Sequence, residues 1–157
     1  MAARTSSSPA RIEASLTMGL TAVTSEAPLS VWPGAGEGHV RPYLLRAYPL
    51  LSDDSITGPA FGRGLAHLSA EVGVRALSLG PSSFGTATFL DLAQPWSQPN
   101  STAWGPGLAS FGCGVRLRLP GFAGALRADV AWSGSRGKPV FSLAWREGWP
   151  GLPAAIR

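Results

Sequence analysis

Three charged side chains are the residues of this 157-residue chain that could work together chemically: Arg46, Glu71 and Asp91. Arg46 stands in a long stretch rich in glycine and proline, whereas each carboxylate stands in a segment where apolar residues alternate with small or polar ones. If those segments form a wall that brings the three together, Arg46 needs an anionic partner, because an unpaired buried charge is costly. The alternative is a solvated Arg46 in a loop, with Asp91 as a carboxylate at the end of a strand.

Enzymatic chemistry finds little support in the sequence. Glu71 and Asp91 could be named a general acid–base pair, but no binding cleft can be argued from the segments that carry them. No Gly-x-Ser-x-Gly elbow and no phosphate-binding loop occurs. Cys113 is the only cysteine, and the two histidines are far apart without ligand spacing. We therefore expect no catalytic residues, no metal and no cofactor.

The charged residues also limit the class of partner. The chain carries 13 Lys+Arg against 9 Asp+Glu, and Lys138 is its only lysine. The basic residues are scattered singly instead of in runs, so nucleic-acid binding is not expected. Residues 1–10 are rich in serine and alanine with no apolar run after them, which predicts a disordered tail and no secretory signal peptide. No apolar run approaches the roughly 20 residues of a membrane-spanning helix.

The segments that must position these side chains alternate with a period of two, which is typical of β-strands and not of helices. In residues 11–23, for example, isoleucine, leucine and methionine alternate with charged, hydroxyl and glycine residues. Such segments exceed the roughly five or six residues of a usual soluble strand and approach the roughly 9–11 needed to cross a bilayer at a tilt. The predicted strands are 11–23, 66–77, 83–93, 107–119, 122–132 and 139–149.

Long and short connections separate these strands. Residues 24–64 and 94–106 form the long ones, and tight turns follow Leu79 and Leu119. This asymmetry fits an all-β antiparallel meander of about six long strands from a transmembrane β-barrel, with its apolar face toward lipid and its polar face lining the lumen. The alternative is a soluble antiparallel sheet packed on a core. In a barrel, three tryptophans would fit an aromatic girdle at the membrane interface: Trp132, Trp145 and Trp149.

Two motifs resemble the bacterial outer-membrane assembly and translocation family, also called bacterial surface antigen or POTRA–barrel proteins. Residues 45–49, Leu-Arg-Ala-Tyr-Pro, look like the family's Arg-Gly-Tyr/Phe motif, which is carried on a long extracellular loop after a glycine-rich approach. Residues 89–93, Phe-Leu-Asp-Leu-Ala, look like its Phe-x-Asp-x-Gly strand motif. Ala47 and Ala93 stand where the family has glycine.

Two further stretches carry the same resemblance. Ala-Glu-Val at 70–72, followed by Arg75, is similar to the strand after that loop, and residues 112–129 are similar to the closing hairpin before a last aromatic strand. The resemblance covers about residues 11–149 and implies the C-terminal part of an outer-membrane barrel, between a tail at 1–10 and a tail at 150–157. The family's final strand ends at its aromatic residue, whereas here a tail follows Trp149.

The resemblance also implies roles for individual residues. In the family the loop arginine is held by the strand aspartate, which pins the loop inside the lumen. Arg46, Ala47 and Tyr48 thus correspond to the lumen loop motif, Asp91 to the anchoring carboxylate, and Glu71 to a second one. Further inward charges would form a lumen charge ladder across neighbouring strands, or else ordinary cross-strand pairs on a wet face: Arg75, Arg116, Arg118, Arg127 and Asp129.

These inferences predict an outer-membrane protein whose intact form inserts or secretes other β-rich proteins. Its partners would be outer-membrane lipid, the rest of the barrel, the family's periplasmic POTRA domains, and client barrel or secreted proteins. Six strands cannot close a barrel and leave two open edges. We therefore expect either a gene fragment or a truncated gene model, with no POTRA domain in this stretch and no transport activity of its own.

Two rival functions stay open at this point. One is another outer-membrane barrel, of the porin or autotransporter kind, in which Arg46 has no Asp91 partner and the long loop constricts a pore. The other is a soluble β-sandwich binding module, whose apolar faces would be covered by a second sheet.

Overall fold

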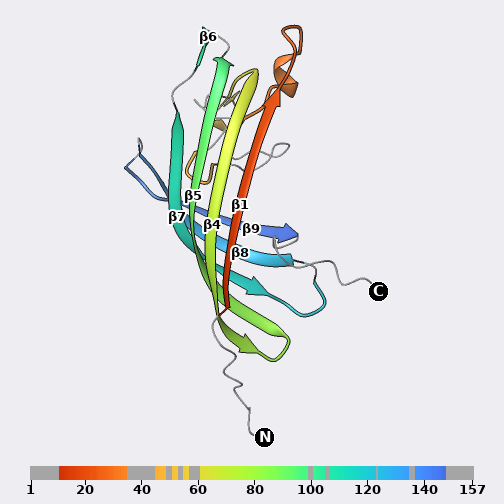
Figure 1. Ribbon diagram of the computed structural model, residues 1–157, viewed down its shortest axis with the longest axis vertical. Helices are drawn as coiled ribbons and strands as arrows, with labels where there is room; N and C mark the ends of the chain where they lie inside the picture. Colours follow the sequence, from red (N-terminus) through yellow and green to blue (C-terminus); the bar gives the residue numbers. More distant parts are fainter. Residues whose placement is uncertain are drawn as a thin grey trace, which may run out of the picture.

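Six long strands form one antiparallel meander in the computed structural model, in chain order (Figure 1). The structure describes residues 11–34, 45–48, 51–52, 55–56, 61–98, 101–104, 107–122, 124–134 and 137–147. The strands of the meander are β1 (Arg11–Ala22), β4 (Gly64–Leu79), β5 (Ser82–Gln98), β7 (Leu108–Arg118), β8 (Gly124–Ser133) and β9 (Val140–Glu147). The predicted all-β fold class is confirmed. The sheet is not closed, and β1 and β9 are its edges within the described residues.

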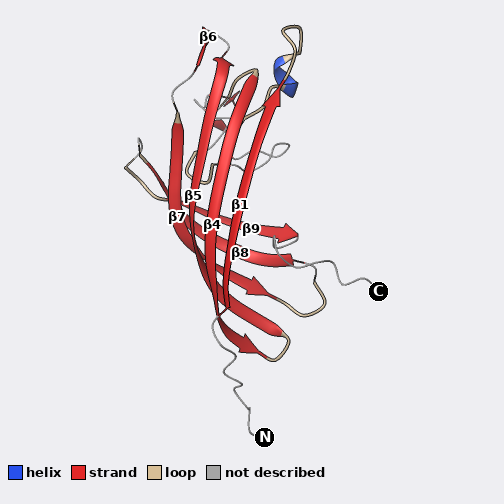
Figure 2. Cartoon of the chain, in the orientation of Figure 1, coloured by secondary structure: helices blue, strands red, loops and turns tan. Residues whose placement is uncertain are grey.

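Four short elements accompany the meander (Figure 2). A 3-10 helix, η1 (Leu29–Val31), follows β1. β2 (Leu51–Ser52) and β3 (Ser55–Ile56) pair with each other, and β6 (Ser101–Trp104) pairs with β5. Among the described residues, no helix is long and apolar enough to cross a membrane. The predicted tails at 1–10 and 150–157 lie outside the described residues.

The prediction of a loop over residues 94–106 is wrong in part, because β5 continues to Gln98 and β6 forms a hairpin with it. β4 begins at Gly64, which pairs with Trp96, so the longer β4 provides a partner for this part of β5. β7 pairs with β5 only as far as Ala93, which leaves one side of Pro95 without a β7 neighbour. Proline, which lacks an N–H, is tolerated at such an edge position.

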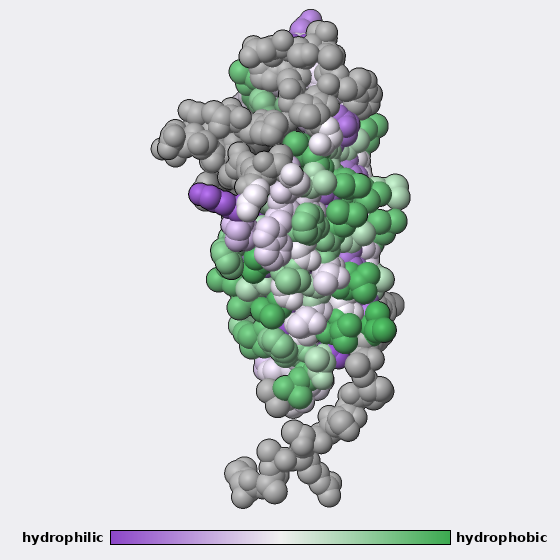
Figure 3. All heavy atoms as spheres, turned by 90° about the vertical axis from the view of Figure 1, so that its left-hand side faces the viewer, coloured by the Kyte–Doolittle hydropathy of each residue, from purple (hydrophilic) through white to green (hydrophobic). Residues whose placement is uncertain are grey.

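The two faces of the meander are the reverse of those of a soluble sheet. On the outer face, Ile12, Leu20 and Phe141 are 71–74% exposed, and Figure 3 shows hydrophobic side chains over much of the surface that it presents. On the inner face, Glu71 and Asp91 are buried. The other sheet of the described residues, β2 with β3, is too small to cover the outer face as a sandwich layer. An apolar outer face over a polar inner face is typical of the wall of a transmembrane barrel.

The sheet is strongly coiled, so that its inner face curves around a small core. β1, β4 and β5 follow the long axis of the molecule, whereas β8 and β9 cross it at a steep angle (Figure 1). The core combines loop residues with residues of the strands, namely Leu45, Ala47, Tyr48, Leu65, Phe89, Ala93, Leu108 and Ala131. The chain thus covers part of its own inner face with residues 45–48.

Candidate functional site

Residues 45–48, which we call the Arg46 turn, come from the long connection and lie buried on the inner face. None of the four is more than 3% exposed. Leu45, Ala47 and Tyr48 pack in the inner core. The guanidinium carbon of Arg46 lies 3.6 Å from the centroid of the Phe89 ring, a cation–π arrangement that strengthens when water is excluded. Apolar packing therefore surrounds one charged side chain.

Three carboxylates meet the guanidinium of Arg46, each from a different strand. Arg46 Nη2 donates to Glu71 Oε2 of β4 at 2.8 Å. Arg46 Nε lies 3.3 Å from Asp91 Oδ2 of β5, and Arg46 Nη1 lies 3.5 Å from Asp129 Oδ2 of β8. The structure thus brings Arg46 together with both carboxylates expected from the sequence. The shortest contact is to Glu71, which the resemblance gave as the second anchoring carboxylate. Asp129, predicted as part of the lumen charge ladder, also contacts Arg46.

A second arginine, Arg116 of β7, contacts two of the same carboxylates. Its Nε and Nη2 lie 3.1 and 3.0 Å from Glu71 Oε1, whereas the contact of Arg46 Nη2 is to Glu71 Oε2. Its Nη1 donates to Asp129 Oδ1. Arg46, Glu71, Arg116 and Asp129 therefore form a closed ring in which cations and anions alternate, and we call it the arginine–carboxylate ring. Charge-assisted pairs of this kind are the strong class of protein hydrogen bonds.

Asp91 is held from both neighbouring strands by serine hydroxyls. Ser69 Oγ donates to Asp91 Oδ1 at 2.6 Å, and Ser110 Oγ donates to Asp91 Oδ2 at 3.3 Å. Both serines are register partners of Asp91, on β4 and β7. Neither serine is among the site residues expected from the sequence, although the pairing of the predicted strands around Asp91 is the signal that could identify them.

Two arginines of the site face each other directly across β7 and β8. Arg116 is the register partner of Arg127, and like charges opposite one another destabilise a sheet. Asp129 relieves the repulsion, because its carboxylate contacts Arg116 Nη1 and also lies 3.4 Å from Arg127 Nε. The buried charges of the site then balance, with three arginines (Arg46, Arg116, Arg127) and three carboxylates (Glu71, Asp91, Asp129).

Two glycines of β7 make room for this arrangement. A Cβ at Gly114 would overlap the Asp129 carboxylate and the carbonyl oxygen of Ala128. A Cβ at Gly112 would overlap the carbonyl oxygen of Val130 and the Phe89 ring that stacks on Arg46. Glycine is the residue that permits such close approach. The alternation of glycine with other residues in β7 therefore belongs to the site.

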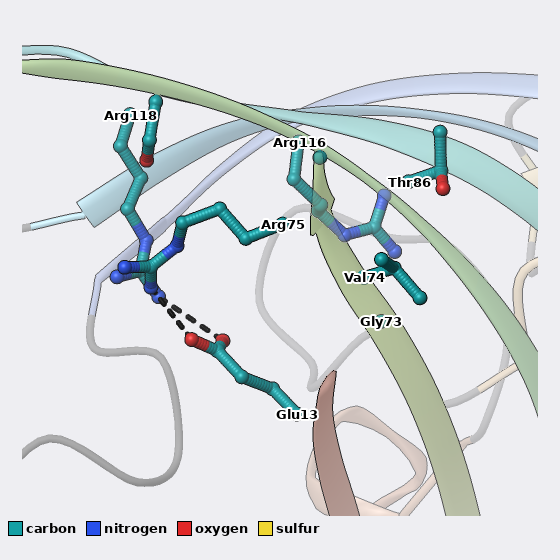
Figure 4. A pocket seen from close by; sticks show the side chains of 9 residues that line it. Glu13, Gly73, Val74, Arg75, Thr86, Arg116 and Arg118 are labelled. Atoms are coloured by element: carbon teal, nitrogen blue, oxygen red, sulfur yellow. Dashed lines mark hydrogen bonds and ion pairs between the residues drawn. The ribbon is translucent and has the colours of Figure 1, made fainter. Parts of the chain in front are cut away.

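The remaining two members of the predicted ladder lie in a separate group, which we call the Glu13 cluster. Arg75 Nη2 donates to Glu13 Oε1 at 2.6 Å, and Arg118 Nη2 lies 3.6 Å from Glu13 Oε2. Figure 4 shows Arg75 and Arg118 converging on Glu13 while the guanidinium of Arg116 points away from it. Glu13 and both of its arginines are partly exposed. The five predicted ladder residues thus divide between two groups of contacts.

The predicted girdle tryptophans lie at two levels of the sheet. Trp132 pairs in register with Phe111, toward the end with the long connections, and the two rings stack at 6.4 Å between centroids. Trp145 pairs with Leu126, toward the tight turn of Gly121, and meets Phe122 edge to face. If both are interfacial, each marks a different surface of the membrane. Trp149 lies outside the described residues.

The site pairs positively charged side chains with negatively charged ones. The described residues include no cluster of histidine, cysteine or carboxylate side chains suited to a metal ion. Every carboxylate of the site already contacts at least one arginine. Its ion pairs join the Arg46 turn to β4, β5 and β8.

The comparisons with known proteins gave one match. A family model described as the Omp85 superfamily domain matches residues 36–142, more than half of the chain. No curated protein and no solved structure gave a match.

Proposed function

Because the chain belongs to the Omp85 superfamily, whose members are non-enzymatic assembly and transport barrels of the outer membrane, we propose that it is the C-terminal barrel segment of a protein that inserts or translocates β-rich proteins. The segment spans residues 11–149, with the long loop at 24–64. Its clients are other barrel proteins or secreted proteins with much β-structure.

The observation that carries this proposal is the buried Arg46 turn on the inner face of a sheet whose outer face is apolar. Arg46 contacts Glu71, Asp91 and Asp129 at 2.8–3.5 Å. In a porin-like barrel we expected Arg46 to lack an Asp91 partner, so their contact argues against that rival. In a soluble sandwich the apolar face would be covered, and its exposure argues against the other rival.

The proposal includes a role for the turn. Arg46, Ala47 and Tyr48 form the lumen loop motif, Asp91 and Glu71 anchor it, and the docked turn keeps the long loop inside the barrel. Outer-membrane lipid surrounds the apolar face, where Trp132 and Trp145 lie at the interfaces.

The open edges of the sheet bear on how the segment acts. β1 and β9 each have an unpaired side within the described residues, and a lipid-exposed sheet edge does not occur in hydrocarbon. We propose that further strands complete the barrel and that periplasmic POTRA domains belong to the working protein. The six strands alone then have no transport activity.

The experiment that tests the function replaces the loop arginine within the complete barrel protein, in cells that depend on that protein. We expect Arg46→Ala to leave the protein in the outer-membrane fraction but to lower the amount of newly inserted client barrels several-fold, because the loop loses its ionic anchor. Arg118→Gln, which affects the Glu13 cluster, is the matched control and should leave insertion near the parent level. Unchanged client insertion in Arg46→Ala, or membrane conductance to small solutes as the main activity, would overturn the proposal.

A further inference from the structure

Arg116 duplicates the contacts of Arg46 from a fixed position in the sheet. Both arginines contact Glu71 and Asp129, and each carboxylate gives one oxygen to Arg46 and the other to Arg116. Arg46 belongs to a turn outside the strands of the meander, whereas Arg116 belongs to β7, which pairs with β5 on one side and with β8 on the other. The ring therefore has one cation from a turn and one cation from a strand of the sheet.

This division has a consequence for the carboxylates. With Arg116 in place, Glu71 and Asp129 have a cation whether or not the turn is docked. Without Arg116, Arg46 would be the one cation left at Glu71 among the described residues, and three buried carboxylates would face two arginines. An excess of buried negative charge is costly, so the carboxylates would turn toward water and no longer be oriented toward Arg46.

We propose that Arg116 is a positioning residue: it holds Glu71 and Asp129 in the geometry that Arg46 needs, and so determines where the Arg46 turn docks. The planar guanidinium suits this role, because Nε and Nη2 meet one oxygen of Glu71 while Nη1 meets Asp129. A lysine ammonium carries the same charge but lacks the rigid fork. Gly114 supplies the space in which Arg116 and Asp129 meet.

The inference deepens the proposed role of the docked turn, but its readout is the position of the turn and not client insertion. Client insertion can prove independent of the Arg46 turn while Arg116 still determines where the turn docks. In that case the proposed function fails and the inference stands, so the two failures are distinguishable.

The test measures thiol labelling of the turn in the membrane-embedded protein. Ala47→Cys, in a Cys113→Ala background, places a single thiol on the buried turn next to Arg46. Labelling of a buried thiol by a small water-soluble methanethiosulfonate follows the equilibrium for local opening. We expect Arg116→Gln to raise the labelling rate by about tenfold or more, because the carboxylates lose their fixed partner.

The matched control is Arg118→Gln, two residues along β7 on the same face. It removes the same charge from the Glu13 cluster and should leave the labelling rate within about twofold of the parent, as expected for a distant site. The double variant Arg116→Gln with Asp129→Asn restores the balance of charge around Arg46, and its labelling rate should fall back toward the parent rate. A purely structural role of Arg116 predicts instead that the second substitution adds to the damage.

A second variant covers the case in which Arg116→Gln does not fold. Arg116→Lys keeps the charge without the fork, and we expect a labelling rate between those of the parent and Arg116→Gln, with heat-modifiable migration of the barrel retained. Equal labelling in the Arg116→Lys and parent proteins would overturn the role of the fork. Equal labelling in Arg116→Gln and Arg118→Gln would overturn the positioning role itself.

Discussion

The inner face carries two groups of ion pairs that differ in burial and in composition. The arginine–carboxylate ring, with Asp91 and Arg127 beside it, is buried, balanced in charge and includes a loop residue. The Glu13 cluster joins two arginines to one carboxylate, is partly exposed and includes strand residues only. The two groups lie on the same sheet, with Arg116 and Arg118 two positions apart on β7.

The two groups differ in what they contribute to the sheet. In the ring, each charge depends on its partners because water is largely excluded, so the loss of one partner leaves an uncompensated buried charge. In the Glu13 cluster, water can replace a lost partner, and such pairs contribute little. The ring therefore specifies where a loop is held, whereas the Glu13 cluster adds a local contact between β1, β4 and β7.

The largest effect is expected for Asp129→Asn. The substitution keeps the shape of the side chain but removes the charge shared by Arg46, Arg116 and Arg127. We expect the free energy of unfolding to fall by about 3–5 kcal/mol, the usual cost of breaking a buried ion pair. Urea unfolding of the membrane-embedded protein measures it. A loss of less than about 1 kcal/mol, typical of exposed pairs, would show that the ring contributes no more to the free energy of unfolding than the Glu13 cluster does.

A smaller effect is expected for Gly114→Ala, which tests the space beneath the ring. The added methyl group would overlap the Asp129 carboxylate and the backbone carbonyl of Ala128, and the carbonyl cannot move without shifting β8. We expect a destabilisation of about 1–3 kcal/mol, the usual cost of overpacking.

Gly134→Ala is the matched control for that substitution, because nothing lies within 4 Å of a Cβ at Gly134. Its free energy of unfolding should stay within about 0.5 kcal/mol of the parent, as for most surface substitutions. Equal values for the two alanine variants would mean that the ring tolerates a wider spacing of β7 and β8.

Much of the fold follows from alternation alone. A period of two assigns Leu16 of β1 to the apolar face and Glu71 of β4 to the polar face, and the structure places them on opposite faces. All six predicted strands are present. The strand ends were less predictable: proline at 95 reads as a loop in sequence, but the longer β4 provides it with a partner. Pairing between strands decides such ends, and a single segment does not reveal its neighbours.

The candidate site was predictable in part for a similar reason. Alternation and the motif around Arg46 identify the inward charges, and the structure brings Arg46 to Asp91 and Glu71. The ring was not predictable, since it joins residues of β4, β7 and β8 with a loop, and only the coil of the sheet brings these together. The division of the predicted ladder has the same cause, because alternation assigns Arg116 and Arg118 to one face without saying which carboxylate each one meets.

The smallest effect is expected for Glu13→Gln, which removes the one carboxylate of the Glu13 cluster. The Glu13 side chain is 17% exposed and that of Arg75 is 26% exposed, so water can solvate the arginines left behind. We expect a loss of about 0–1 kcal/mol in the free energy of unfolding, as for other exposed pairs. The loss should shrink further when salt is raised to about 1 M, where the Debye length falls to about 3 Å. The same urea titrations at two salt concentrations measure it, with Asp129→Asn as the comparison, because a buried pair is screened much less. A salt-insensitive loss as large as that of Asp129→Asn would place Glu13 among the buried organising charges and remove the distinction between the two groups.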